Sequence, residues 1–225
     1  MSIKLGVLLI GQTPNDFYQA FFRTCLPDSI RIEMAGVLDG LSVDEVLSLE
    51  SEAENEVLFT RVGKNIPVVL PVHQVHSRMQ GKVEELNARG VTAVIIACTR
   101  DFSFLNSSTP LIFPGRLLRN NVFAIARETI PIGVILPLEK QIETNLRKFW
   151  CREGIRACFA AASPGDHPGE VVKAAKRLKE KGAKLIVLDC MAYSSEEKAF
   201  VRQETDCMVI LARTLLGSIL KNLFE

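Results

Sequence analysis

Two of the six cysteines in this 225-residue chain occupy matching positions in a repeated pattern. Residues 89–99 read Arg-Gly-Val-Thr-Ala-Val-Ile-Ile-Ala-Cys-Thr, and residues 181–191 read Lys-Gly-Ala-Lys-Leu-Ile-Val-Leu-Asp-Cys-Met. In both segments a basic residue and a glycine precede an apolar run that ends in cysteine. One thiolate can remove a proton from a carbon while an opposing thiol delivers one, which inverts or isomerises that carbon without a cofactor. Cys98 and Cys190 are therefore the candidate catalytic pair.

A second repeated signature lies upstream of each cysteine, where Gly6-Val-Leu-Leu corresponds to Gly133-Val-Ile-Leu. The interval from Gly6 to Cys98 is 92 residues and that from Gly133 to Cys190 is 57. The first half therefore carries about 35 extra residues, which we place between 36 and 72. The two signatures occur in the same order, so the sequence predicts two related halves.

The elements around the cysteines are typical of a covered parallel sheet. The apolar runs are short, apolar on both faces and separated by segments of helical periodicity. Gly90 and Gly182 stand where a helix ends in a left-handed residue. Because ligands of such sheets bind outside the carboxyl ends of the strands, Cys98 and Cys190 are expected to point into a crevice. Two halves facing each other would place the thiols on opposite walls of one cleft.

Two further helices follow from local patterns. Ser42 with Glu45 three residues later forms a capping-box pattern, which predicts a helix near 43–52. Leu216, Ile219, Leu220 and Leu223 share one face of a segment that runs from 213 to 225, which predicts a docked terminal helix.

The composition excludes several classes of protein. The chain has 27 basic and 26 acidic residues, a net charge of +1, so neither a nucleic-acid partner nor a membrane surface is expected. No apolar stretch approaches the ~20 residues of a membrane span. The N-terminal apolar run is too short for a signal peptide, and there is no C-x-x-C pair, so we expect a cytoplasmic protein with reduced thiols. Cys25, Cys151, Cys158 and Cys207 are expected to be small buried apolar residues, an alternative that also applies to the catalytic candidates.

Polar residues near the predicted strand ends are candidate substrate contacts. Gln12 and Thr13 follow the first strand and can bind a carboxylate, or else form a plain turn with Pro14 opening a helix. Arg61 can make a bidentate carboxylate contact or be an exposed surface charge. Asp39 in Leu-Asp-Gly fits a tight turn as well as a site.

The residues that follow the two cysteines are candidates for the same reason. Thr99 and Arg100 come directly after Cys98, and Arg100 can instead pair with Asp101 or cap a helix. Tyr193 and Ser194 lie just past Cys190, where Ser194 can equally be a helix N-cap.

We expect neither a metal nor a cofactor. His73 and His76 lack a third ligand nearby in the sequence, and we interpret them as ordinary polar residues. The glycines form neither a dinucleotide-binding nor a Walker A motif. The expected ligand is a small carboxylate, and the sequence allows a homodimer without requiring one.

Six segments resemble the AroM family over nearly the whole chain, and more distantly the aspartate/glutamate racemase superfamily. They are Leu9-Ile-Gly-Gln-Thr-Pro14, Val37-Leu-Asp-Gly-Leu-Ser42, Thr60-Arg61, Ala97-Cys-Thr99, Ile132-Gly-Val-Ile-Leu-Pro137 and Leu188-Asp-Cys-Met-Ala-Tyr193. The resemblance implies an α/β fold of two similar parallel-sheet halves related by pseudo-two-fold symmetry, with a ligand cleft between them. It implies a first domain of residues 1–112 plus 209–225, to which the last strand and helix return, and a second domain of 113–208.

The resemblance also implies a reaction class. In the superfamily the catalytic cysteines stand in Cys-Asn-Thr and Gly-Cys-Thr turns, and Cys98 and Cys190 match those turns in position. The implied activity is that of a cofactor-independent racemase, isomerase or related decarboxylase acting on a small carboxylic acid. Cys98 is followed directly by Thr99, and Cys190 by Met191, so polar side chains that help to bind an amino acid are missing. The alternatives are a non-catalytic carboxylate-binding protein that keeps the fold and, more remotely, a thiol redox protein.

Overall fold

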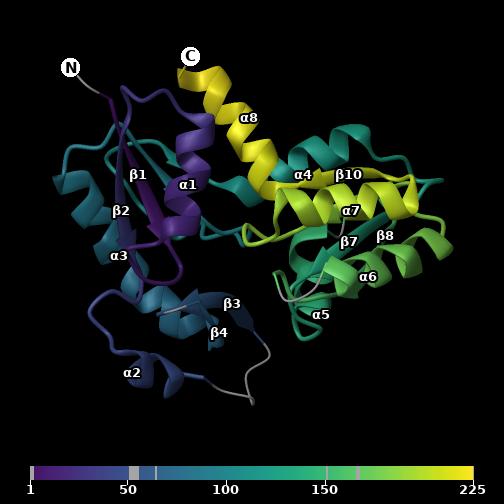
Figure 1. The fold of residues 1–225 in the computed structure, drawn as a ribbon, viewed down its shortest axis with the longest axis horizontal. Helices are drawn as coiled ribbons and strands as arrows, with labels where there is room; N and C mark the ends of the chain where they lie inside the picture. Colours follow the sequence, from purple (N-terminus) through teal and green to yellow (C-terminus); the bar gives the residue numbers. More distant parts are fainter. Residues whose placement is uncertain (1–2, 51–55, 64, 151, 166–167, 225) are drawn as a thin grey trace. The chain divides into compact units, whose positions relative to one another are not determined.

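The computed structural model describes residues 3–50, 56–63, 65–150, 152–165 and 168–224. The chain divides into two compact units (Figure 1), one of Met1–Pro114 with Gly217–Glu225 and the other of Gly115–Leu216. Each unit is built on its own four-stranded sheet. In the parts of the chain that the structure describes, no helix combines the length and the apolar character needed to cross a bilayer.

All strands of the first sheet are parallel and lie in the order β2-β1-β5-β6. Their bounds are β1 Lys4–Leu9, β2 Arg31–Gly36, β5 Ala93–Ile96 and β6 Leu111–Ile112. Helix α1 (Asp16–Cys25) follows β1, and α3 (Val72–Ala88) packs on β1 and β2. The side chains of β5 are entirely buried, because helices and loops cover both faces of the sheet.

The second sheet repeats this architecture in the order β10-β9-β7-β8. Its strands are β7 Ile132–Leu136, β8 Ala157–Ala161, β9 Leu185–Leu188 and β10 Met208–Leu211. In both sheets the strand that ends before a candidate cysteine, β5 or β9, pairs with the strand that opens its half, β1 or β7. The helices are α4 Pro114–Ile125, α5 Gln141–Asn145, the π-helical segment η1 Leu146–Trp150, α6 Pro168–Glu180, α7 Ser195–Thr205 and α8 Ala212–Phe224.

The register of the strands confirms the repeat seen in the sequence. Gly6 lies opposite Val94 in the first sheet, and Gly133 lies opposite Ile186 in the second. Both glycines allow close packing of the covering residues, since a Cβ on Gly133 would lie 2.8 Å from the Ile186 Cδ1 atom. The helix-ending glycines are equivalent as well, with φ of 72° at Gly90 and 93° at Gly182.

The extra residues of the first half form a hairpin in the predicted place. Strands β3 (Val57–Val62) and β4 (Ile66–Pro71) pair antiparallel between β2 and α3, preceded by the short helix α2 (Val43–Leu47). The capping box is present, but α2 ends at Leu47 rather than near 52. The Glu50 carboxylate accepts a hydrogen bond from the Val69 N–H at 2.8 Å, which ties the chain after α2 to the hairpin. Residues 51 and 52 lie outside the described residues.

The C-terminal segment differs from the prediction. We predicted that residues 209–225 join the first domain, but β10 pairs with β9 in the second sheet, with Val209 opposite Ile186. The reason is that β10 completes the sheet of the second repeat, and Leu211 is buried in that unit's core. Only from Gly217 does α8 belong to the first unit, where a Cβ on Gly217 would lie 3.4 Å from the Cys25 Cβ of α1. The predicted terminal helix is confirmed as α8.

Candidate functional site

Cys98 and Cys190 occupy equivalent places just beyond the carboxyl ends of β5 and β9. The residue before each cysteine bonds to the first strand of its sheet: the Ala97 N–H donates to the Leu8 carbonyl at 2.9 Å and the Asp189 N–H to the Ile135 carbonyl at 3.0 Å. Both cysteines are partly exposed, and each packs against its unit's core. The predicted structural equivalence of the two residues is therefore present in the fold.

The turns around the two thiols differ in detail. The Cys98 N–H donates to the Ile96 carbonyl at 2.6 Å, which closes a sharp turn at the strand end. In the second unit the Ala192 N–H points at the Cys190 Sγ, 3.5 Å away. A donor of this kind favours negative charge on the sulfur, though sulfur is a weak acceptor.

Two of the other described cysteines, Cys25 and Cys207, fit the expectation of buried apolar residues, and Cys158 fits it only in part. Cys25 and Cys207 are buried, and their thiols donate to backbone carbonyls at 3.6 and 3.5 Å. Cys158 is half-buried, with its Sγ 3.4 Å from the Ile132 carbonyl oxygen. Burial raises the pKa of both Cys25 and Cys158, which keeps these thiols protonated. Cys151 lies outside the described residues.

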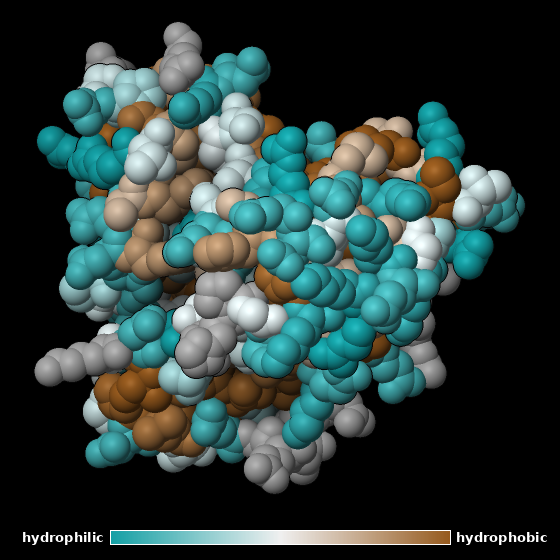
Figure 2. Space-filling view, turned by 45° about the vertical axis from the view of Figure 1, so that its right-hand side comes forward, coloured by the Kyte–Doolittle hydropathy of each residue, from teal (hydrophilic) through white to brown (hydrophobic). Residues whose placement is uncertain are grey.

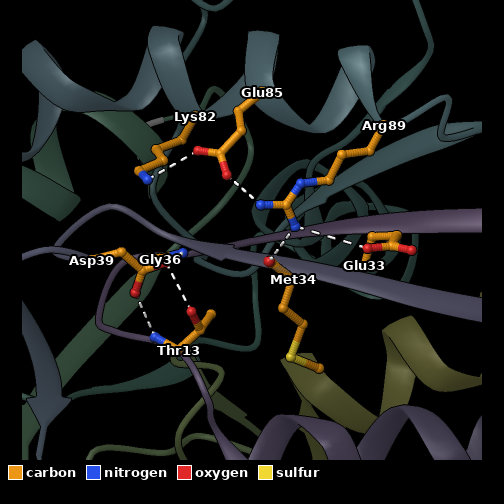
Figure 3. A network of polar contacts seen from close by, with 8 residues as sticks. All are labelled: Thr13, Glu33, Met34, Gly36, Asp39, Lys82, Glu85 and Arg89. Atoms are coloured by element: carbon orange, nitrogen blue, oxygen red, sulfur yellow. Dashed lines mark hydrogen bonds and ion pairs between the residues drawn. The ribbon is translucent and has the colours of Figure 1, made fainter.

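Thr13 is held by Asp39 at the carboxyl ends of β1 and β2 (Figure 3). The Asp39 carboxylate accepts the Thr13 N–H at 2.6 Å, the Thr13 hydroxyl at 2.8 Å and the Gly36 N–H at 2.7 Å. Asp39 is thus a clamp between two strand ends. The Thr13 hydroxyl therefore donates its hydrogen bond to Asp39 within the protein.

Gln12 joins the same loop to the inserted hairpin. Its Nε2 donates to the carbonyls of Leu38 and Leu41 at 3.2 and 2.6 Å, and its Oε1 accepts the Gly63 N–H at 3.3 Å. The backbone at Gly11 passes so close to β3 that a Cβ there would lie 2.6 Å from the Arg61 carbonyl oxygen. The amide predicted to bind substrate therefore makes contacts within the unit.

Arg61 lies on β3, near the turn of the hairpin. Its Nη1 donates to the Asn65 carbonyl at 3.1 Å, and its guanidinium stands 5.5 Å from the centre of the Phe59 ring. Both contacts are within the inserted hairpin. The apolar side chains of this hairpin and of the neighbouring segments form the hydrophobic area in the lower part of Figure 2.

Arg100 lies two residues after Cys98 and forms an ion pair with Glu56, which directly precedes β3. The Arg100 side chain is only 11% exposed, whereas that of Glu56 is 38% exposed. Thr99 is partly buried between Cys98 and Arg100. The sequence analysis missed Glu56, because nothing local connects residues that lie 44 positions apart.

His76, in the first turns of α3, lies within electrostatic reach of the Arg100–Glu56 pair. Its ring lies against Phe102 and Phe104, with centroid distances of 5.5 and 4.6 Å. The Nε2 atom is buried without a hydrogen-bond partner in the described part of the chain. Burial first, and then the positive charge of Arg100, lowers the pKa of His76, so that its neutral form is favoured.

The candidates after Cys190 make structural contacts in the second unit. Tyr193 is fully buried, and its hydroxyl donates to the Ala162 carbonyl at 2.6 Å. Ser194 is the N-cap of α7, where its Oγ accepts the Glu197 N–H at 3.0 Å and its own N–H donates to the Glu197 carboxylate at 2.5 Å. Ser194 is therefore a helix N-cap, which was one of the two alternatives predicted from the sequence.

Two buried carboxylates lie on either side of Cys190 in the sequence. Asp189 is 3% exposed and accepts the Trp150 indole N–H at 2.9 Å, with Trp150 at the end of the π-helical segment. Glu197 is 2% exposed and also accepts the Gly165 N–H at 2.9 Å. Residues 3–50, 56–63, 65–150, 152–165 and 168–224 contain no cluster of three or more side chains suited to a metal ion.

Comparisons with known proteins place this arrangement in a family. A family model described as AroM protein matches residues 5–224. No curated protein matches the sequence. Among solved structures, glutamate racemase from Aquifex pyrophilus is similar with a TM-score of 0.60 and 16% identity, covering 99% of this chain and 84% of that chain.

Two further structures extend the likeness. Aspartate racemase from Picrophilus torridus has a TM-score of 0.56 at 11% identity, covering 98% of this chain and 93% of that chain. Arylmalonate decarboxylase has a TM-score of 0.58 at 13% identity, covering 98% of this chain and 92% of that chain. At such low identity the likeness concerns the fold, and it confirms the predicted α/β architecture.

Proposed function

The chain belongs to the AroM protein family, and from that membership we propose that it is a cofactor-independent racemase or isomerase acting on a small carboxylic acid. The carrying observation is the equivalence of Cys98 and Cys190 in two parallel sheets of matching architecture. The proteins named as aspartate and glutamate racemases share this fold. Arylmalonate decarboxylase also has this fold, so decarboxylation of a small carboxylic acid is the next candidate reaction.

The proposed mechanism uses one thiolate and one thiol on opposite faces of the substrate carbon next to its carboxylate. The thiolate takes the proton from that carbon, and the electron pair of the C–H bond is delocalised into the carboxylate. The thiol then delivers its proton to the opposite face, and the carbon regains four bonds with inverted configuration. The proton and electron balance closes within the substrate and the two thiols.

Proton exchange in deuterium oxide tests this function without knowledge of the substrate. The full-length protein is incubated with a panel of chiral and prochiral carboxylic acids, and loss of the α-proton signal is followed by NMR. Because general acid–base groups contribute about 10²–10⁴-fold, we expect Cys98→Ser and Cys190→Ser each to lower the rate of α-proton exchange at least ~100-fold. Cys207→Ser, which changes a buried core thiol, is the matched control. Exchange at the wild-type rate in both site variants would exclude the two-thiol mechanism.

One observation favours a second function, that of a carboxylate-binding protein without turnover. Thr99 directly follows Cys98 and the buried Met191 directly follows Cys190, so the polar side chains of the superfamily's cysteine turns are missing beside both thiols. This alternative predicts that a carboxylate stabilises the folded protein in proportion to ln(1 + [L]/Kd) while no α-proton exchanges. Stabilisation accompanied by exchange would favour the enzyme.

A further inference from the structure

The segment that follows Cys98 is irregular, and two separate parts of the first unit hold it. Residues 97–110 connect β5 to β6 without a helix or strand. Arg100, near the start of this segment, pairs with Glu56, which lies at the base of the inserted hairpin. From these contacts we infer that Glu56 is a positioning residue: through Arg100 it fixes the turn that carries the Cys98 thiol. The consequence for turnover rests on the proposed function, whereas the consequence for the turn does not.

The hairpin lies at the same edge of the sheet as this turn. Glu56, directly before β3, pairs with Arg100 beyond the carboxyl end of β5. Near the other end of β3, a Cβ on Gly11, which follows β1, would lie 2.6 Å from the Arg61 carbonyl oxygen. Strand β3 therefore runs along the carboxyl ends of β5 and β1 (Figure 1). Parallel sheets bind their ligands at this edge.

Glu56 is itself held in place by the backbone. Its carbonyl accepts the N–H of Val72, the first residue of α3, at 2.9 Å. The next residue, Val57, is buried and begins the pairing of β3 with β4. The Arg100 side chain is only 11% exposed, and a guanidinium so far removed from water needs an acceptor of opposite charge. The ion pair therefore ties the Cys98 turn to the point where the hairpin joins α3.

The far end of the segment is attached to α3 independently of Glu56. Phe102 is fully buried, and its ring lies edge-on to that of His76. The Gln80 side chain makes two hydrogen bonds to the backbone of Asn106: its Oε1 accepts the N–H at 3.0 Å, and its Nε2 donates to the carbonyl at 3.1 Å. Removal of the Glu56 carboxylate should therefore loosen the part next to Cys98 and leave Asn106 in place.

The turn at Cys190 is held by contacts of another kind. Asp189 accepts the Trp150 indole N–H, and Ser194 begins α7 with a capping box directly after the turn. Residues 162–167 join β8 to α6, which leaves too little chain for a hairpin like β3–β4. These contacts are made inside the second unit, so Cys190 is an internal reference for effects on Cys98.

Amide hydrogen exchange, followed by NMR in the full-length protein, tests the inference. The Cys98 N–H is the reporter, because it donates to the Ile96 carbonyl at 2.6 Å and is protected while the turn is closed. In Glu56→Gln this amide should exchange at least about tenfold faster, since loss of a charge-assisted bond favours local opening. The amides of Asn106 and Cys190 should keep their rates within about twofold. Glu56 is remote in sequence from all three, so their intrinsic exchange rates do not change.

Further variants distinguish positioning from general destabilisation. Glu56→Asp keeps the charge on a side chain one methylene shorter and should restore part of the protection of the Cys98 amide. Arg100→Gln should act like Glu56→Gln, and the double variant should exceed neither by more than about twofold, because both changes remove the same pair. Glu128→Gln, at an exposed glutamate, is the matched control.

Two results would overturn the inference: an unchanged Cys98 amide in Glu56→Gln, or an equal acceleration at Cys98 and Cys190. If Glu56→Gln does not fold, the comparison of Glu56→Asp with the wild type at the same amides decides, because the shorter side chain should still accelerate exchange at Cys98 alone.

Turnover gives a second readout, which is separable from the first. For any acid on which the wild type shows α-proton exchange, Glu56→Gln should lower kcat at least about tenfold and leave KM within about twofold, because a displaced thiol impairs the chemical step rather than binding. An unchanged kcat in a variant with a faster Cys98 amide would reject the consequence for turnover. A faster Cys98 amide in the variant, with no α-proton exchange by the wild type, would retain the positioning role and reject the proposed function. Wild-type α-proton exchange with an unchanged Cys98 amide in the variant would do the reverse.

Discussion

Replacing Asp39 with alanine removes three hydrogen bonds at once. The carboxylate accepts from the Thr13 N–H, the Thr13 hydroxyl and the Gly36 N–H at 2.6, 2.8 and 2.7 Å. Hydrogen bonds to a charged acceptor contribute about 1.5–3 kcal/mol each. Because this site is only partly buried, water replaces part of the three bonds that are lost. We therefore expect Asp39→Ala to lower the free energy of unfolding by about 3 kcal/mol. Thr13→Val removes the hydroxyl bond alone and is expected to cost about 1 kcal/mol.

The assay is thermal and urea unfolding of the wild type, both single variants and the double variant. For a chain of this size about 1 kcal/mol corresponds to a shift of about 2–4 °C, so Asp39→Ala should lower the melting temperature by roughly 9 °C. The two changes share a partner, so the double variant should cost less than the sum of the singles. Asp28→Ala, at an exposed aspartate, is the control. The reasoning is refuted if Asp39→Ala costs no more than Thr13→Val.

Three further predictions test other contacts. Gly11→Ala should cost about 1–3 kcal/mol, because the new Cβ would lie 2.6 Å from the Arg61 carbonyl oxygen, and urea unfolding measures it. Tyr193→Phe leaves the carbonyl at the other end of a buried 2.6 Å bond unsatisfied and should cost about 1–2 kcal/mol in the same assay. The pKa of His76 in the folded protein lies below its unfolded value. The stability that the neutral His76 contributes is therefore fully present above the unfolded pKa of about 6.5, and it is lost as the pH falls through the folded pKa. His76→Gln should therefore flatten the decline in melting temperature between about pH 7 and about pH 5.

Each of these predictions has a result that would contradict it. Gly81→Ala, on an exposed helical position where a Cβ meets nothing within 4 Å, should be tolerated, and equal costs at Gly81 and Gly11 would rule out the close approach. An unchanged unfolding curve for Tyr193→Phe would mean that the hydroxyl bond contributes nothing. The exposed His73 gives the control His73→Gln, and an equal flattening by that variant would show that burial of His76 is not the cause.

The sequence predicted those features that depend on short segments. The glycine, strand and cysteine pattern was sufficient to find both halves, because a buried parallel strand and a left-handed helix end have local signatures. The capping box at Ser42 was predicted for the same reason, although the helix that it begins ends at Leu47.

Contacts between distant segments could not be predicted in this way. The Asp39 clamp on Thr13 spans 26 residues and the Arg100–Glu56 pair spans 44, and no periodicity connects their members. The placement of β10 was wrong, because a short apolar strand carries no mark of the sheet that it joins. The pairing of the two thiols at one substrate stays a prediction.

The helices that follow the two sheets make the units unequal in the way the chain builds them. In each half a helix follows the last strand of the sheet, and that helix is assigned largely to the other unit: α4 from Gly115 to the second unit, and α8 from Gly217 to the first. The second unit is therefore one continuous segment, whereas the first unit combines both ends of the chain. A chain that ends before Gly217 would contain every residue of the second unit but would lack the segment that places Gly217 beside Cys25 of α1.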